Sequence, residues 1–162
     1  MKNNLSTYLL LCMIWIATSC APSSSGGEQN IAIVEQYVAA VENQNVDEME
    51  RLLGDDYIGF GPSLGDTIRR EAALENWKDY TETLYESISY DNVRLLPVVI
   101  TDGARPGEYV SMYSIVNITF KSGEEVKTWA NTVYKIEAGR IAQTYTFYNE
   151  ADVYEQLGYS FY

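Results

Sequence analysis

The sequence predicts an α+β domain in which three N-terminal helices cover one face of a curved antiparallel sheet. Apolar residues recur at helical spacing as far as about residue 85, and from Ile88 onward the apolar period changes from 3.6 residues to 2. Short polar segments that contain glycine separate the alternating runs, as hairpin turns do. Helices gathered first and long strands afterwards indicate one sheet with helices on one side.

The helices can be placed from apolar spacing and capping residues. The first begins near Gln29 and presents an apolar face. Asn45 followed by Glu48 is typical of a capping box that opens a second, short helix, and Gly54 can close that helix. The apolar face of the first helix is formed by Ile31, Val34, Tyr37, Val38 and Val41.

The rest of the chain alternates between strands and turns, apart from one long helix. Residues 55–60 read as a strand that Gly61-Pro62 ends, and Asp66 or Thr67 can cap a third helix that runs to about Tyr85. Four further strands are expected within Ile88–Ile100, Tyr109–Phe120, Glu125–Ile136 and Arg140–Tyr148, with a last helical turn at Ala151–Leu157.

Composition excludes several classes of function. The chain has 162 residues, which suits one domain with a real core, and it contains no histidine. Without histidine there is no Ser-His-Asp or Cys-His nucleophile system and no histidine-ligated metal. A net charge of -12 argues against a nucleic-acid partner.

The N-terminus predicts export and lipidation. Lys2 precedes the apolar run Tyr8–Ala17, and small residues then lead to Cys20, an order that resembles a bacterial lipobox. We expect residues 1–19 to be a signal peptide, residues 20–29 to be an acylated cysteine with a flexible tether, and residues 30–162 to be the domain. The protein would then be a lipoprotein of the bacterial cell envelope, in the outer membrane, with the lipid bilayer as its partner. Simple secretion and a retained anchor remain the alternatives.

The order of elements, with a set of short motifs, resembles the nuclear transport factor 2-like superfamily, which includes SnoaL-like polyketide cyclases and ketosteroid isomerases. The resemblance covers about residues 30–158 and implies a cone-shaped fold. The motifs that carry it are Tyr37-Val38-Ala39-Ala40, Asn45-Val46-Asp47, Asp55-Asp56, Gly61-Pro62 and Gly139-Arg140-Ile141.

The resemblance also implies where catalytic groups would lie. Tyr37 resembles the oxyanion donor of ketosteroid isomerases, but Gly61 stands where those enzymes have their aspartate base. Their second acid falls near Asn131 or Thr132, with a register uncertain by one residue. SnoaL-like cyclases often place an acid at the end of the final strand, where this chain has Asn149. Because an amide cannot exchange a proton at neutral pH, the resemblance favours a domain that binds without catalysing.

Aromatic residues suggest a ligand pocket inside the cone. Such a pocket would suit a small apolar or amphipathic ligand, without metal or other cofactor. Ordinary core packing, together with tyrosines on a sheet face, is the alternative. The expected lining is Tyr37, Tyr57, Phe60, Trp77, Tyr113, Trp129, Tyr145 and Phe147, with Asn131 and Asn149 as polar contacts.

Two other functions remain open. A cyclase- or isomerase-like enzyme could use Tyr37 with Asp56, Asp66 or another displaced acid as its base. Alternatively, the outer face of the strands expected at 109–120 and 125–136 could pair with a partner, most simply as a homodimer, if it forms a sufficiently large apolar patch.

Overall fold

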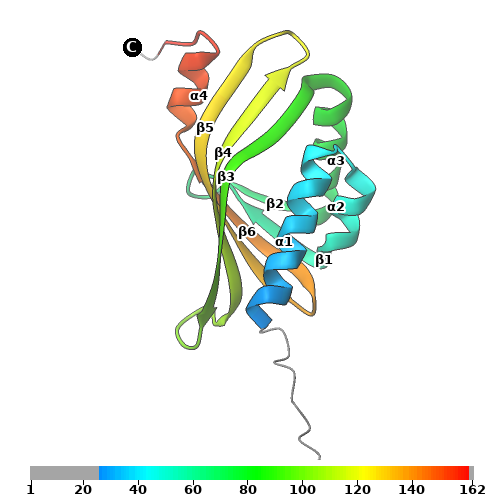
Figure 1. The fold of residues 1–162 in the computed structure, drawn as a ribbon, viewed down its shortest axis with the longest axis vertical. Helices are drawn as coiled ribbons and strands as arrows, with labels where there is room; N and C mark the ends of the chain where they lie inside the picture. Colours follow the sequence, from blue (N-terminus) through cyan, green and yellow to red (C-terminus); the bar gives the residue numbers. More distant parts are fainter. Residues whose placement is uncertain (1–25, 161–162) are drawn as a thin grey trace, which may run out of the picture.

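A curled, unclosed sheet of six strands forms the body of the molecule in the computed structural model, which describes residues 26–160 (Figure 1). The strand order is β2-β1-β6-β5-β4-β3. All neighbouring strands are antiparallel except β1 and β6, which run parallel. The strands are β1 (Leu53–Phe60), β2 (Thr67–Arg69), β3 (Tyr85–Ile100), β4 (Gly107–Phe120), β5 (Glu125–Glu137) and β6 (Arg140–Tyr148).

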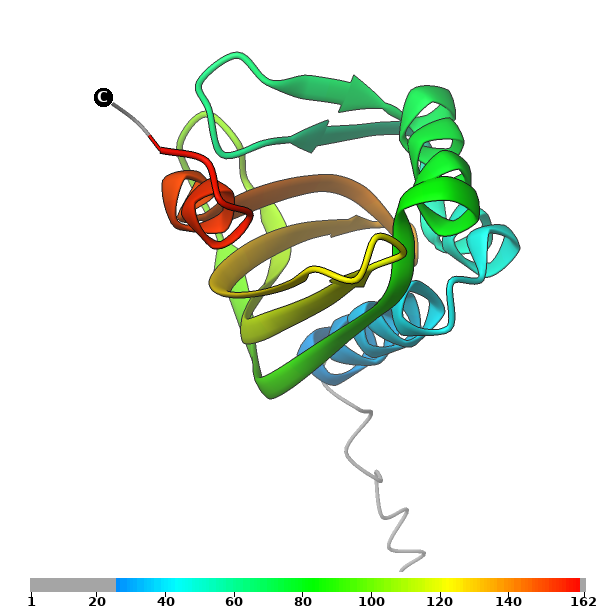
Figure 2. The same cartoon turned by 90° about the horizontal axis from the view of Figure 1, so that it is seen from above.

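Three helices cover the concave face of this sheet, as expected (Figure 2). The helix α1 (Gly26–Glu42) packs on β3 and β4, α3 (Arg70–Asp79) packs on β1, and α2 (Val46–Leu52) lies between α1 and α3. A fourth helix, α4 (Glu150–Gln156), follows β6 and contacts β5. No helix within residues 26–160 is long and apolar enough to cross a membrane.

The core lies between α1, α2 and the sheet. Val34 and Val41 of α1 meet Met49 of α2, Leu53 of β1 and Ile141 of β6, all of them almost fully buried. The predicted capping box is present in part, because the Asn45 side chain accepts a hydrogen bond from the backbone N–H of Glu48. Gly54, in contrast, does not cap α2; it is the second residue of β1.

The first helix begins at Gly26, so residues 26–29 are helical and the expectation of a flexible tether through residue 29 is wrong for them. The Asn30 amide donates a hydrogen bond of 2.6 Å to the Glu108 carboxylate of β4, and that carboxylate also lies against Gly26. An acid beside the start of a helix stabilises it, because the N-terminal end carries partial positive charge. The predicted signal peptide and Cys20 lie outside the described residues.

The third helix is shorter than expected. Thr67–Arg69 form the strand β2, which pairs with β1, and α3 begins only at Arg70. The reason is the turn after Phe60, where the Gly61 N–H bonds to the Asp66 carbonyl and directs the chain into a hairpin. From Tyr80 to Leu84 the helix continues as one π-helical turn before β3. The four long strands lie where the alternation predicts them, and β6 has the predicted bounds.

Candidate functional site

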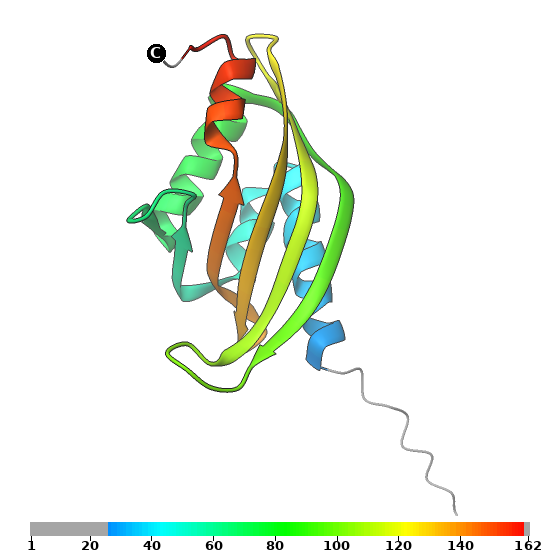
Figure 3. The same ribbon diagram turned by 90° about the vertical axis from the view of Figure 1, so that its left-hand side faces the viewer.

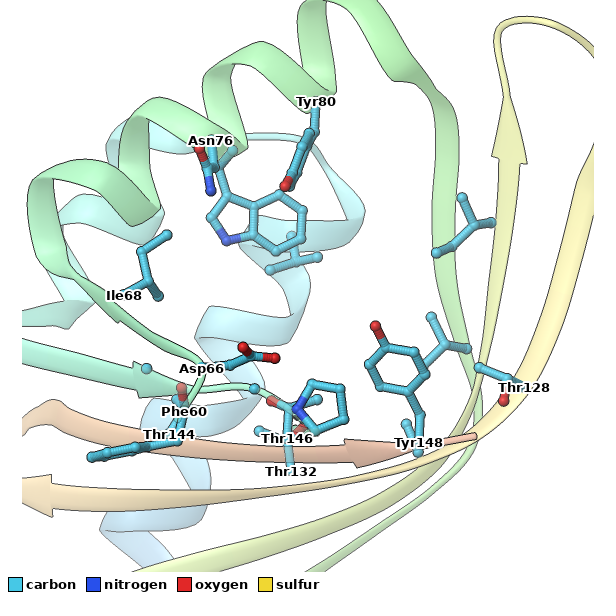
Figure 4. Close-up of a pocket in the computed structure, with 18 of the residues that line it drawn as sticks. Phe60, Asp66, Ile68, Asn76, Tyr80, Thr128, Thr132, Thr144, Thr146 and Tyr148 are labelled. Atoms are coloured by element: carbon cyan, nitrogen blue, oxygen red, sulfur yellow. Dashed lines mark hydrogen bonds between the residues drawn. The ribbon is translucent and has the colours of Figure 1, made fainter. Parts of the chain in front are cut away.

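A cavity of about 750 Å³ lies between the concave face of the sheet and the helices α1 and α3 (Figure 4). Aromatic rings from both the helices and the strands line it, threonine hydroxyls lie on its sheet side, and one carboxylate enters it. The main lining residues are Tyr37, Tyr57, Asp66, Asn76, Trp77, Tyr80, Tyr85, Tyr90, Thr128, Thr132, Tyr134, Thr144, Thr146 and Tyr148.

The buried phenols of the cavity remain protonated at neutral pH. The ring of Tyr37 in α1 meets the ring of Tyr134 in β5 edge-on, with centroids 6.2 Å apart, and Tyr37 hydrogen-bonds to Trp77. Burial raises the pKa of Tyr37, Tyr90 and Tyr134 well above the usual value for a tyrosine, and the Glu42 carboxylate raises that of Tyr90 further. Neutral phenols both donate and accept hydrogen bonds, so this wall can bind a ligand oxygen without adding charge.

Hydroxyl groups on the sheet form pairs across strands. The Tyr57 hydroxyl lies 2.7 Å from Thr144 Oγ1, and Thr132 Oγ1 lies 3.3 Å from Thr146 Oγ1. Gly59 makes the first contact possible, because a Cβ at residue 59 would stand only 2.8 Å from the Tyr57 hydroxyl oxygen. The pairs leave the sheet side of the cavity polar but uncharged.

Asp66 is the only charged residue among the described residues that line the cavity. Figure 4 shows it extending into the cavity from the loop between β1 and β2, and the residue is exposed, so the cavity reaches the surface there. A Cβ built on Gly61 would lie 3.3 Å from Asp66 Oδ2. The Asp66 carboxylate therefore occupies the space that a side chain at residue 61 would enter.

Some residues expected in the pocket are there. Tyr37, Tyr57 and Trp77 line the cavity. Phe60 borders it, but its ring turns to the outer face and stacks on Tyr145, with centroids 4.6 Å apart (Figure 4).

For β4 and β5 the expected lining is wrong. The side chains of Tyr113 in β4 and Trp129 in β5 are 48% and 66% exposed and lie outside the cavity. Asn131 also points outward and donates to Ser111 Oγ and the Met112 carbonyl, whereas Thr132 faces the cavity. Successive strand residues face opposite sides, so Trp129 and Asn131 share the face of Lys127 and Lys135. Those two lysines were the signal that could have identified the outer face.

In β6 a bulge reverses the expected facing. Lys135 pairs with Gln143 and Ile136 with Ile141, so Ala142 is an extra residue in β6. Ile141 is buried inside, yet Tyr145 and Phe147, which lie three and five pairs further along the ladder, face outward. Asn149 is not a ligand contact either, because its side chain caps α4 by accepting from the Asp152 N–H at 3.3 Å.

Several lining residues were not predicted, because the aromatic residues predicted for the pocket in β4, β5 and β6 lie on the outer face of those strands. The alternation of β5 would have identified Thr128, Thr132 and Tyr134, which share the phase of the buried residues Val126 and Ile136. Other polar or aromatic lining residues that were not predicted include Asn76, Tyr80, Tyr85, Tyr90, Thr144, Thr146 and Tyr148.

A second, shallower hollow of about 440 Å³ lies on the outer face, between β3, β4, β5 and β6. Tyr145 and Phe147 belong to it, and the Arg105 guanidinium lies 5.5 Å from the centre of the Phe60 ring and donates to the Tyr145 hydroxyl. Pairing of two copies through this face stays a prediction. No group of three or more histidine, cysteine, aspartate or glutamate side chains within residues 26–160 is placed to hold a metal ion.

The Tyr57–Thr144 contact can be tested by a double-mutant cycle. Tyr57→Phe should lower the free energy of unfolding by about 1–2 kcal/mol, because it leaves a buried hydroxyl without its partner. Adding Thr144→Val should cost less than the sum of the two single changes, as measured by urea unfolding. Tyr113→Phe, at an exposed phenol, is the control. Strictly additive losses would show that the two hydroxyls do not stabilise each other.

The buried phenols predict a loss of stability in alkali. Their folded pKa lies above the value of the unfolded chain, so the stabilisation is complete below about pH 10 and is lost as the pH rises beyond it. Each such phenol should contribute a slope of about 1.4 kcal/mol per pH unit there. Tyr90→Phe should reduce the slope of the free energy of unfolding by that amount. Equal slopes for both proteins would contradict the burial of a neutral Tyr90.

Known proteins share this fold and, in part, this sequence. Residues 34–144 match the family model described as SnoaL-like domain. No curated protein sequence matches the chain.

Solved structures superimpose on most of the chain at low identity. A candidate polyketide cyclase from Xanthomonas campestris has a TM-score of 0.67 at 13% identity, covering 82% of this chain and 99% of its own. An LEH-like epoxide hydrolase from M. tuberculosis has a TM-score of 0.62 at 18% identity, covering 82% and 91%. IdmH of Streptomyces antibioticus, also a candidate polyketide cyclase, gives 0.61 at 18%, covering 81% and 99%. At these identities the solved structures show a shared fold. The match of residues 34–144 to the family model shows that the chain belongs to the SnoaL-like domain family.

Proposed function

We propose that the domain binds a small apolar or amphipathic molecule inside the cone. The observation that carries this function is the cavity of about 750 Å³, whose described lining is aromatic and hydroxyl-bearing and contains one charged residue. Small-molecule sites have volumes of roughly 300–1,000 Å³ and are mostly apolar with a few polar groups. A core that packed solid would have left no such space.

The lining indicates what the ligand looks like. Trp77 and Tyr80 offer ring edges and faces on the helix side, which suits a flat hydrocarbon or aromatic skeleton. Thr132 and Thr146 offer hydroxyls on the sheet side, which suits one or two oxygen atoms on that skeleton. Strong anions are disfavoured, because Asp66 and the net charge of -12 repel them.

Filling the cavity should abolish binding. Thr146→Trp places a large ring inside, while Phe147→Trp changes the next residue on the outer face. With N-phenyl-1-naphthylamine as an uncharged fluorescent probe, fluorescence titration should show the apparent Kd of Thr146→Trp raised roughly tenfold or more. Phe147→Trp should bind as the unsubstituted protein does. Equal binding by both variants would mean that the probe does not enter the cone.

A second function is favoured by the position of Asp66. Its carboxylate fills the space beside Gly61, and the cavity adds neutral phenols as hydrogen-bond donors. We propose that Asp66 can accept a proton from a carbon next to a carbonyl group and return it to the resulting enolate. A phenol that donates to the enolate oxygen would stabilise the negative charge as it forms. Candidate polyketide cyclases of the same fold are consistent with this chemistry.

Proton transfer can be measured without knowing the natural substrate. The probe is β-tetralone in deuterated water, with exchange of its acidic C–H followed by nuclear magnetic resonance. Asp66→Asn should remove any exchange above the uncatalysed rate, because an amide does not act as a base. Asp56→Asn is the matched control, since Asp56 is exposed on β1 outside the cavity. Equal rates with and without the protein would leave binding as the function.

We further propose that the protein is a lipoprotein of the bacterial cell envelope, with its acyl chains on Cys20. The support is the sequence order of a cation, an apolar run and small residues before that cysteine. Cys20→Ser should move the protein from the membrane fraction to the soluble fraction, and mass spectrometry of the N-terminal peptide should lose the mass of the acyl chains. A membrane fraction unchanged by Cys20→Ser would contradict this location.

A further inference from the structure

The end of the edge strand β3 is apolar on both of its faces. Leu96, Pro97, Val98, Val99 and Ile100 are five consecutive exposed residues, and Val99 is 67% exposed. In a strand with one face against the core, apolar and polar side chains normally alternate, and the apolar set is buried. A run of exposed apolar residues in an edge strand is a liability unless something covers it.

This apolar tip lies at the end of the molecule where the described chain begins. Figures 1 and 3 place the β3–β4 hairpin and the start of α1 at the same end of the long axis. The contact of 2.6 Å between Asn30 of α1 and Glu108 of β4 holds them together. Gly26 follows Cys20 by six residues, which span about 20 Å even when fully extended. Acyl chains on Cys20 therefore hold this end of the domain close to a bilayer.

Charge and backbone favour lipid over a second strand. Residues 92–101 contain no acid, in a chain that has 23 of them, and Asp102 and Arg105 in the adjoining loop balance each other. Pro97 has no N–H to donate, which opposes the addition of a strand along this edge. An apolar, weakly charged tip suits the interfacial layer of a bilayer.

We infer that the apolar tip, Leu96–Ile100, inserts into the surface of the bilayer that holds the acylated Cys20, so that the chain is attached at two points. This inference rests on the proposed acylation. Two points of attachment fix the orientation of the domain on the bilayer. The cavity extends to Phe120 and Val126, beside the β4–β5 turn at the opposite end of the long axis, so that end of the cavity is turned away from the bilayer. The cone would then receive its ligand from the aqueous side.

Hydrogen exchange measured by mass spectrometry tests the insertion. The acylated full-length protein, purified from membranes and placed in phosphatidylcholine vesicles, is compared with the Cys20→Ser protein in buffer. On the vesicles, the amides of residues 98–105 should exchange at about one fifth of their rate in buffer or more slowly, while the exchange rates in the turn at 121–124 are unchanged. A triple variant with serine at Val98, Val99 and Ile100 should lose the protection and remain on the vesicles. Leu64→Ser, at an exposed leucine in the β1–β2 loop, should keep it.

The outcomes separate the two proposals. If the N-terminal peptide carries no acyl mass, the anchor is absent and the insertion falls with it. If the protein is acylated and vesicle-bound but residues 98–105 exchange as fast as in buffer, the insertion is overturned and the lipoprotein stands. Protection that appears without vesicles and increases with protein concentration would mean that a second copy covers the tip, and would also overturn it.

Discussion

The packing of α1 against one part of the concave face is the contact on which the site depends. Val34 and Val41 of α1 lie in the core between α1, α2 and the sheet, and the Tyr37 ring packs edge-on against that of Tyr134. The helix α3 and the π-helical turn Tyr80–Leu84 cover the cavity opposite the sheet. The cavity is therefore a space that an otherwise close-packed core leaves between these helices and the sheet.

The chemistry of the cavity follows from the near absence of charged groups in its lining. Buried phenols stay protonated because burial penalises the phenolate, and the hydroxyls of Thr132 and Thr146 satisfy each other across β5 and β6. The interior thus offers hydrogen bonds without charge, and Asp66 is the one described lining residue that carries charge. The Asp66 carboxylate can reach the cavity from the β1–β2 turn because residue 61, beside it, is a glycine without a side chain. The two proposed functions, acid–base chemistry and simple binding, would both use this arrangement and differ only in whether a ligand proton meets that carboxylate.

Some structural elements could be predicted from the sequence, and others could not. The Asn45 cap, the four long strands and the resemblance on which the family rests were all predictable, because they depend on neighbouring residues or on a regular period. The strand β2 was not, because Thr67–Arg69 become a strand only through pairing with β1. The helix α1 begins at Gly26, earlier than predicted, because the carboxylate of Glu108, distant in sequence, lies against its first turn. The predicted lining residues of β6 were wrong because the extra residue Ala142 reverses the facing of Tyr145 and Phe147.

By itself, the sequence determined the fold class and the family, since period and local motifs carry these, whereas the anchor at Cys20 stays a prediction. It also determined that no histidine chemistry is available. Only the tertiary structure decided which side chains meet inside the cone and which face outward. A single bulge or a contact between distant residues changes the facing of a whole strand without leaving a periodic signal in the chain. For the same reason, the carboxylate of Asp66 could be recognised as part of the cavity only once β1 and β2 had been paired.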